Sequence, residues 1–276
     1  SVSGSREGKV SLHYSAGVFS NHYTFQSALH EGLNAMLLST DSLRNQFSRG
    51  EIGFRVSPGM RVTITEKLKP YFSFPVTYLL VNKNDLVRSN DSRISYWLFA
   101  PNVYLDYPLS TRITLYGSAS HNNNIGGMRE DLIGYMMTSY RNLSRNDGLQ
   151  SKNSTANIYV NLNYRNPFTT LFMTLGVNWM NNWRNMLYDT RYTGILSSAT
   201  GILHPHSAQQ FSTGFSIGKS VDDISSELRT NAGYARNQSI ALNQGVISPY
   251  TSDSYNVSAS STTDIGQFMI LKYSAA

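Results

Sequence analysis

The stretch EIGFRVSPGMRVTI, residues 51–64, alternates strictly between two kinds of side chain. Every even position, from Ile52 to Ile64, is apolar or proline, and every odd position is polar, charged or glycine. Because successive side chains on a β-strand point to opposite faces, the stretch predicts a strand with one apolar and one polar face. It is longer than a typical globular strand of about 5–6 residues. It is long enough to cross a bilayer, which takes about 9–11 tilted residues.

The same alternation returns along the rest of the chain. It is clear in residues 153–164, 168–179, 209–219 and 224–235. Weaker alternation runs through residues 9–18, 22–38, 69–81, 94–105, 111–120, 252–261 and 266–273. We therefore expect about twelve strands and no helix.

The connections between these strands alternate in length. Short ones are expected at residues 65–68, 106–110, 165–167, 220–223 and 262–265. Long polar ones are expected at residues 40–49, 82–93, 121–152, 181–207 and 237–251. Outer-membrane barrels have short periplasmic turns and longer extracellular loops, whereas the Greek-key connections of a sandwich mix lengths. The pattern predicts an all-β fold, an antiparallel up-and-down transmembrane β-barrel.

The composition narrows the possible functions. The chain has 276 residues, a net charge of +6 and no cysteine, which excludes disulfides, thiolate zinc sites and a cysteine nucleophile. Its Lys and Arg residues are dispersed, so we expect no nucleic-acid partner. No run of about 18 apolar residues occurs, but a barrel strand needs apolar residues only at alternate positions. The eighteen Tyr and three Trp suit the aromatic girdles of a membrane barrel.

The two ends of the sequence favour a partial barrel. No signal peptide opens the chain, and residues 268–276 lack the terminal aromatic residue on which outer-membrane barrels usually end. We expect residues 1–276 to form one incomplete domain of a larger barrel, without a plug domain. Unpaired strand edges are not tolerated in lipid, so either this piece closes on itself or further strands complete it.

Several motifs carry a family resemblance. Tyr164-Arg165-Asn166-Pro167-Phe168 resembles the "YRNP" periplasmic turn of TonB-dependent outer-membrane receptors of the type with a carboxypeptidase-like regulatory domain. In the same order, residues 69–81, 102–116, 134–147 and 215–221 are similar to strands, hairpins and an extracellular loop of that family. Together these segments cover most of residues 50–272.

The resemblance implies a barrel of about twenty-two strands, closed by an N-terminal plug. Such receptors lie in the outer membrane of Gram-negative cells and import scarce nutrients such as siderophores, cobalamin, glycans or peptides. The partners it implies are outer-membrane lipid, a nutrient ligand at the extracellular loops, and the TonB complex. TonB would act only through a plug, and this sequence contains no recognisable plug, TonB box or regulatory domain.

Three motifs contain residue types that serve in catalysis or metal binding. Gly214-Phe215-Ser216-Ile217-Gly218 matches a nucleophile elbow, but an elbow needs a helix after the strand, and here the strand pattern continues. Arg129-Glu130-Asp131 offers paired carboxylates, which we interpret as a solvated charge cluster in a loop. His204-Pro205-His206 lacks a further ligand nearby in sequence. We expect no enzyme activity, no cofactor and no metal site.

Ligand contacts are expected in the two longest loops, because binding residues sit on loops held by a rigid scaffold. The loops at residues 121–152 and 181–207 carry aromatic and imidazole side chains that could stack on a flat ligand. The candidates are Tyr140, Trp183, Tyr188, Tyr192, His204 and His206. The aromatic members could equally belong to the outer girdle.

Three other classes of protein remain open at this point. The first is a passive outer-membrane porin, which shares the strand pattern but has no plug. The second is an outer-membrane enzyme of the barrel protease or lipase type, which would need Asp, His and Ser together at the rim. The third is a surface-exposed all-β adhesin, in which the apolar faces would meet in a packed core.

Overall fold

The computed structural model describes residues 2–6, 9–28, 30–31, 36–37, 41–221, 226–265 and 269–275. The helices are η1 (Asp41–Leu43) and α1 (Met128–Asp131). The strands are β1 (Val2–Arg6), β2 (Val10–Ala28), β3 (His30–Glu31), β4 (Met36–Leu37), β5 (Arg44–Val62), β6 (Tyr71–Ser73), β7 (Val76–Asp85), β8 (Asn90–Phe99), β9 (Asn102–Pro108), β10 (Ile113–Ile125), β11 (Met136–Ser139), β12 (Asn142–Arg145), β13 (Lys152–Asn166), β14 (Leu171–Thr193), β15 (Leu196–Val221), β16 (Ser226–Asn243), β17 (Val246–Ile265) and β18 (Met269–Ala275).

One sheet of sixteen strands forms almost the whole molecule. Its main path runs β1-β2-β5-β6-β9-β10-β13-β14-β15-β16-β17-β18, twelve strands in sequence order. Neighbours on this path are antiparallel, which confirms the predicted all-β meander and the expectation of about twelve strands. Short parallel pairs join β12 to β15 and β14 to β16.

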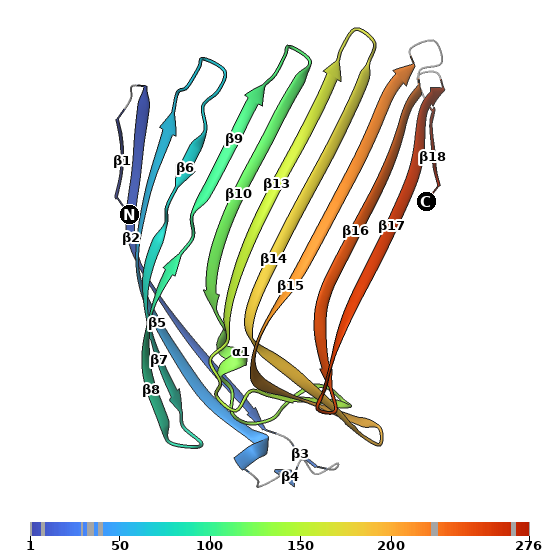
Figure 1. The fold of residues 1–276 in the computed structure, drawn as a ribbon. Coiled ribbons are helices and arrows are strands. Elements are labelled where there is room, and N and C mark those ends of the chain that lie inside the picture. Colours follow the sequence, from blue (N-terminus) through green and yellow to red (C-terminus); the bar gives the residue numbers. More distant parts are fainter. Residues whose placement is uncertain are drawn as a thin grey trace.

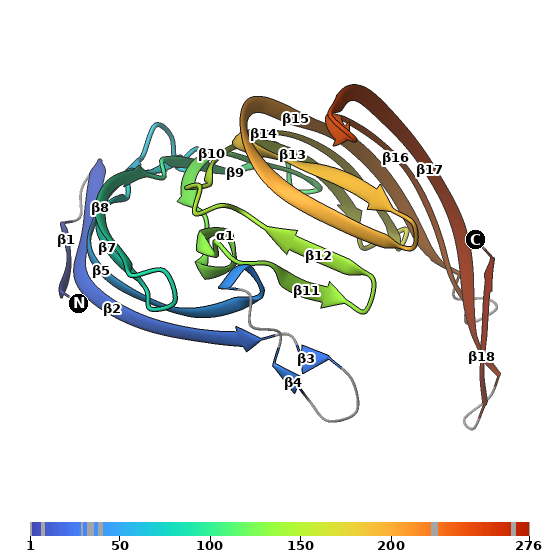
Figure 2. The same ribbon diagram turned by 90° about the horizontal axis from the view of Figure 1, so that it is seen from below.

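The sheet is curved and open in the part of the chain that the structure describes. Figures 1 and 2 show β1 and β18 at opposite edges of a trough-shaped wall. Within the described ranges, β1 pairs with β2 alone and β18 with β17 alone. The short turns lie at one end of the wall, and the longer hairpins and connections lie at the other, which we call the loop end (Figure 1).

Prolines interrupt the ladder partway along the wall. Proline has no N–H to donate, so a strand breaks or bulges where it occurs. The Phe74 amide donates to Pro58 O at 2.8 Å, and the Ala100 amide donates to Pro75 O at 2.9 Å. The breaks after Ser73 and Phe99 separate β6 from β7 and β9 from β8. Towards the loop end, β8 pairs only with β7 among the described strands.

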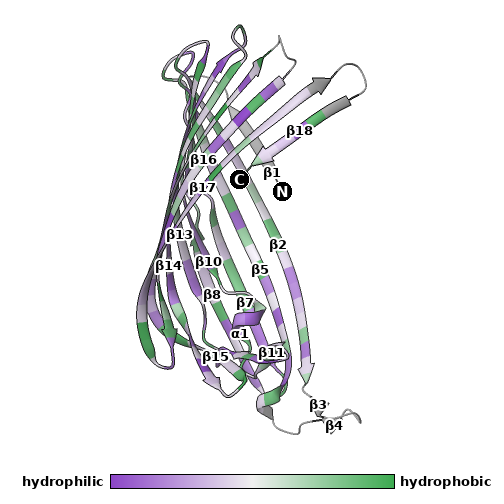
Figure 3. Cartoon of the chain, turned by 90° about the vertical axis from the view of Figure 1, so that its right-hand side faces the viewer, coloured by the Kyte–Doolittle hydropathy of each residue, from purple (hydrophilic) through white to green (hydrophobic). Residues whose placement is uncertain are grey.

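The two faces of the wall differ in polarity, as the alternation predicted. Hydrophobic and hydrophilic residues alternate along the strands (Figure 3). On β5, Arg49 contacts the loop that lies inside the trough (Figure 2), so odd positions of β5 face the concave side. The even positions Ile52, Phe54 and Val56 therefore face outward, and each is exposed.

The strand register extends this assignment across the sheet, because directly paired residues share a face. Arg61 pairs with Tyr71, and Tyr71 pairs with Tyr104. Tyr104 pairs with Ser118, and Ser118 pairs with Tyr159. The polar side of β13 is therefore concave, and its apolar side is convex.

The convex face also carries aromatic ladders. Tyr78 and Trp97 have ring centroids 4.8 Å apart. Phe211 lies 6.5 Å from Tyr234, and Tyr234 lies 5.0 Å from Tyr255. Aromatic rings on the apolar side of a strand are typical of the interface belts of membrane barrels.

Three of the five long loops predicted from sequence are wrong, and most of a fourth, residues 44–49 of the loop predicted at 40–49, belongs to β5. Residues 82–93, 181–207 and 237–251 are tight hairpins, whose turns lie at residues 86–89, 194–195 and 244–245. Gly194 has φ +63°, and Gln244 and Gly245 have φ +51° and +79°, so the last turn has the two positive φ angles of a type I′ hairpin. These strand extensions are rich in polar residues and lack the period-2 alternation, which resembles a loop in sequence although the backbone pairing continues.

Other boundaries differ in smaller ways. Two strands were expected at residues 9–18 and 22–38, but one continuous strand, β2, runs from Val10 to Ala28. Residues 29, 32–35 and 38 lie outside the described residues. Residues 222–225 and 266–268, where turns and strand starts were predicted, also lie outside them. Two short helices, η1 and α1, stand where none was expected.

No helix among the described residues is both long enough and apolar enough to cross a membrane.

Candidate functional site

Residues 126–151 fold into the concave side of the wall at the loop end (Figure 2); we call this segment the inner loop. It contains α1, β11 and β12, and the Gly126 amide closes its base by donating to Ser151 O at 2.8 Å. β12 pairs in parallel with β15, with Asn142 opposite Ser197. The inner loop is therefore held by the sheet rather than projecting from the rim.

A buried charge cluster fixes the inner loop to the wall. Asp131 Oδ2 lies 2.5 Å from Arg49 Nη1, and Asp131 Oδ1 lies 2.5 Å from Lys83 Nζ. The Nη2 of Arg49 pairs with Glu51 Oε1 at 2.7 Å. The side chains of Asp131, Arg49 and Lys83 are 0%, 2% and 7% exposed. Two cations thus face two carboxylates, and the cluster is neutral as a whole.

The same two cations also bond the base of the inner loop. Arg49 Nη1 donates to Gly126 O at 2.7 Å, and Lys83 Nζ donates to the Gln150 side chain. Burial raises the pKa of the Asp131 carboxyl, and the hydrogen bonds and charges of Lys83 and Arg49 oppose that shift. The sequence interpretation of Asp131 as a solvated loop charge is wrong, because β5 and β7 bring two buried cations to it.

A second attachment joins the inner loop to the start of β5. Asn45 Oδ1 accepts from the Gly134 amide at 3.0 Å, and Asn45 Nδ2 donates to Tyr135 O at 3.0 Å. The Tyr135 amide donates to Ser42 O at 2.7 Å. The side chain of Asn45 thus bonds the backbone N–H of Gly134 and the backbone C=O of Tyr135, as a neighbouring strand would do.

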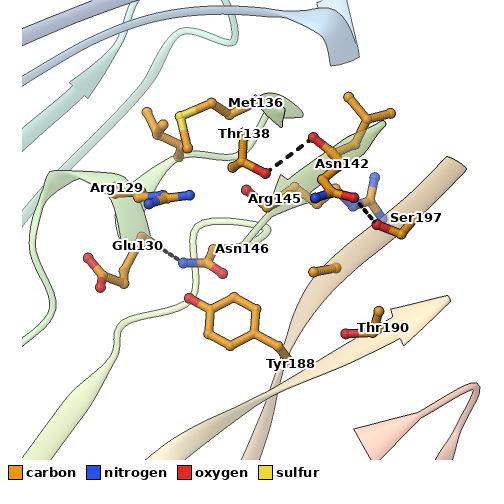
Figure 4. A pocket seen from close by; sticks show the side chains of 14 residues that line it. Arg129, Glu130, Met136, Thr138, Asn142, Arg145, Asn146, Tyr188, Thr190 and Ser197 are labelled. Atoms are coloured by element: carbon orange, nitrogen blue, oxygen red, sulfur yellow. Dashed lines mark hydrogen bonds between the residues drawn. The ribbon is translucent and has the colours of Figure 1, made fainter. Parts of the chain in front are cut away.

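A cavity of about 460 Å³ lies between the inner loop and the extended β14–β15 hairpin. Figure 4 shows Arg129 and Tyr188 extending into it from opposite sides, with the Tyr188 hydroxyl pointing toward Asn146. Its polar lining consists of Arg129, Glu130, Thr138, Asn142, Ser144, Arg145, Asn146, Tyr188, Thr190 and Ser197. We call it the inner-loop pocket.

Hydrogen bonds fix much of the lining of the inner-loop pocket. Asn146 Nδ2 donates to Glu130 O at 2.8 Å, and Ser197 Oγ donates to Asn142 Oδ1 at 2.5 Å. The guanidinium of Arg145 lies 4.8 Å from the centre of the Tyr135 ring and pairs with Asp147. A pocket of mixed charge, amides and hydroxyls can bind a small polar solute by several hydrogen bonds.

The structure scatters the candidate ligand residues that sequence suggested. Tyr188 lines the inner-loop pocket. Trp183 lies on the convex face, with its ring 6.3 Å from that of His121. Tyr140 and Tyr192 are exposed near hairpin tips, and Tyr140 lies against Arg141.

The two histidines lie side by side on β15. The rings of His204 and His206 are stacked 6.5 Å apart, and His206 Nδ1 lies 2.9 Å from His204 O. Among the residues that the structure describes, no group of three or more His, Asp or Glu side chains could hold a metal ion.

The sequence does not reveal most residues of the inner-loop pocket. Arg129 and Glu130 stand out in it only as a charge cluster, and Asn146 and Ser197 carry no signal of their own. The two halves of the pocket meet through the β12–β15 pairing, which joins residues 55 positions apart. Only a register between distant strands could have revealed it.

No known family model matches the chain, and no curated protein matches it. Solved structures do match in shape. The "Copper transporter OprC" is similar with a TM-score of 0.59 and 10% identity, over 95% of this chain and 42% of that one. The siderophore receptor PirA from Pseudomonas aeruginosa is similar with a TM-score of 0.42 and 8% identity, over 96% of this chain and 60% of that one. The chain thus spans less than half of OprC, and it has the fold of part of an outer-membrane β-barrel wall.

Proposed function

We propose that residues 1–276 form part of the barrel wall of a TonB-dependent outer-membrane receptor, of the type with a carboxypeptidase-like regulatory domain. The receptor imports a scarce nutrient of the siderophore, cobalamin, glycan or peptide class. The nutrient binds at the loop end, where the inner loop narrows the lumen. TonB acts through the plug domain of the receptor.

The observation that carries this proposal is the opposite polarity of the two faces. The convex face exposes Val56, Val160 and Leu175, which in water would be part of an extensive apolar surface, and few apolar residues are buried in the described part of the chain. A soluble adhesin would have to bury these side chains in a core. In a membrane the lipid covers these side chains, so no packed core is needed, and the polar concave face then lines an aqueous lumen.

The inner-loop pocket supports a receptor in particular. Its lining is anchored by buried charges and hydrogen bonds, so the binding groups are held in place before a ligand arrives. We assign ligand contact to Arg129, Tyr188 and Asn142. The sequence candidates Tyr140, Trp183, Tyr192, His204 and His206 stay predictions.

Cysteine labelling of the full-length protein in native membranes tests the proposal, since the chain has no cysteine of its own. Single cysteines replace convex residues (Val56, Val160, Leu175) or neighbouring concave residues (Ser57, Asn161, Thr174). We expect a lipid-soluble quencher to reach labels on the convex set alone, and a water-soluble reagent to label the concave set. Convex positions protected from both probes would mean a packed soluble core, and the receptor proposal would fail.

A further inference from the structure

A row of three glycines crosses the concave wall at mid-strand. Gly176 on β14 pairs with Gly214 on β15, and Gly214 pairs with Gly233 on β16. Asn161 on β13 and Asn256 on β17 pair with the two outer glycines and close the row at each end. Adjacent strands lie about 4.8 Å apart, so the three glycines span about 10 Å. We call this row the glycine floor.

The middle of the glycine floor is open. An added Cβ at Gly214 would meet nothing nearer than Ala232 O at 4.0 Å. The side chains of the end asparagines lean over the outer glycines: Asn161 Nδ2 would lie 3.5 Å from a Cβ at Gly176, and the Asn256 amide would collide with one at Gly233. Glycine inside a strand often marks a place where another group approaches the backbone closely.

Polar side chains border the glycine floor on both sides. One neighbouring row contains Thr174, Ser216 and Asn231, which pair in that order. The other contains Tyr159, Asn178, Ser212 and Ala235. These three rows line one cavity of about 480 Å³, and none of its lining residues is charged.

Asn161 indicates that this cavity is built for a ligand. It is 8% exposed, it lines the cavity, and within the described part of the chain its side-chain amide has no hydrogen-bond partner. Its amide atoms are not among the fully buried side-chain atoms of the described residues that lack a partner, so they are accessible from the cavity. A polar group entering over Gly214 could therefore bond the Asn161 amide directly.

The chemistry of the cavity selects one class of ligand. Carboxamides and hydroxyls both donate and accept hydrogen bonds, as sugar hydroxyls do. The floor itself is a flat surface of Cα–H groups, because the sheet already pairs its amides and carbonyls, and such a surface suits the C–H face of a sugar ring. An ionic solute would find no opposite charge in this cavity. The cations Arg165 and Arg229 lie one row beyond Thr174, Ser216 and Asn231, in the row that contains Gly218.

We propose that the glycine floor binds one ring of a neutral carbohydrate, seated on Gly214 and hydrogen-bonded by Asn161 and the flanking amides and hydroxyls. This narrows the nutrient class, and it rests on the proposed function in requiring that the concave face line a lumen. Along β14, the site lies farther from the loop end than the inner-loop pocket does, since Gly176 is near the start of the strand and Tyr188 near its end. A sugar chain that enters at the loop end would therefore meet the inner-loop pocket first.

Binding to an oligosaccharide array tests the proposal. The purified full-length protein in detergent is applied to an array of neutral glucose, galactose and mannose oligomers beside sialylated and sulfated ones. The wild type is expected to bind at least one neutral class. Gly214→Val, which fills the floor, should weaken that binding at least about tenfold. Asn161→Leu should weaken it as well, and it provides a second variant if Gly214→Val fails to fold.

Gly218→Val is the matched control. It lies four residues further along the same strand and on the same face, its Cβ would have ordinary space, and it borders a different cavity. It should change binding by no more than about twofold, as substitutions away from a site do. Binding only to anionic sugars, no binding to neutral ones, or equal losses in both glycine variants would overturn the proposal. Failure of the receptor proposal would appear separately, as protection of the convex cysteines from the lipid quencher.

Discussion

Asp131→Asn is expected to release the inner loop from the wall and to lower the free energy of unfolding by about 3–5 kcal/mol, the usual cost of breaking a buried ion pair from one side. The substitution keeps the shape of the side chain but leaves Arg49 and Lys83 facing Glu51 as the one remaining carboxylate of the cluster. One positive charge would then be buried without compensation. Because the lining of the inner-loop pocket depends on this segment, ligand binding there should be lost as well.

Trypsin digestion of the protein in lipid vesicles measures the release directly, since the inner loop carries Arg129, Arg141 and Arg145. Urea unfolding in the same vesicles gives the free energy. Asp147→Asn is the control: its pair with Arg145 is 3.1 Å long, the Asp147 side chain is 43% exposed, and such a pair contributes about 0–1 kcal/mol. Equal cleavage rates in the two variants would show that Asp131 does not hold the loop.

A double variant separates charge from shape. Adding Lys83→Met to Asp131→Asn removes the excess cation and leaves Arg49 paired with Glu51. If uncompensated charge causes the instability, the double variant should be more stable than Asp131→Asn alone. Two independent losses would instead add together, as they do for residues that are not coupled.

The wall itself could be predicted because alternation is a local property of sequence. The alternation in residues 51–64 predicts both a strand and the side chains on each of its faces. In the structure Ile52, Phe54 and Val56 face outward, as the pattern predicts. The hairpin extensions escaped prediction for the opposite reason. Past Trp183, β14 has a register shift between Arg184 and Met186 and buries Met186 and Leu187. The period-2 signal is therefore lost there, while the hydrogen bonds to β15 continue.

The functional features could not be predicted because they depend on residues far apart in sequence. Asp131 is paired with Arg49, 82 positions away, and with Lys83, 48 positions away. Read locally, Arg129-Glu130-Asp131 is only a charged turn. The glycine floor is similar: Gly214 was visible within a serine-centred motif, but its alignment with Gly176 and Gly233 follows from the register of three strands.

Gly134→Ala is expected to detach the inner loop at its second attachment and to cost about 1–3 kcal/mol, the range for overpacking a well-packed site. A Cβ at Gly134 would lie 2.5 Å from Asn45 Oδ1, 2.6 Å from Arg88 Nη2 and 2.8 Å from the Arg44 carbonyl oxygen. The last of these is backbone of β5 and cannot move aside cheaply. The Gly134–Asn45 hydrogen bond would therefore be lost.

Gly127→Ala provides the matched control within the same loop. Its Cβ would meet only the end of the Glu130 side chain, at 3.4 Å, and its φ of −77° suits an alanine. Hydrogen exchange of the inner-loop amides should rise in Gly134→Ala and stay unchanged in Gly127→Ala. Because Gly134 and Asp131 hold the same segment, the Gly134→Ala/Asp131→Asn pair should lose less stability than the sum of the single losses. A fully additive loss would mean that the two attachments hold the loop independently, and that the inner loop does not open as one unit.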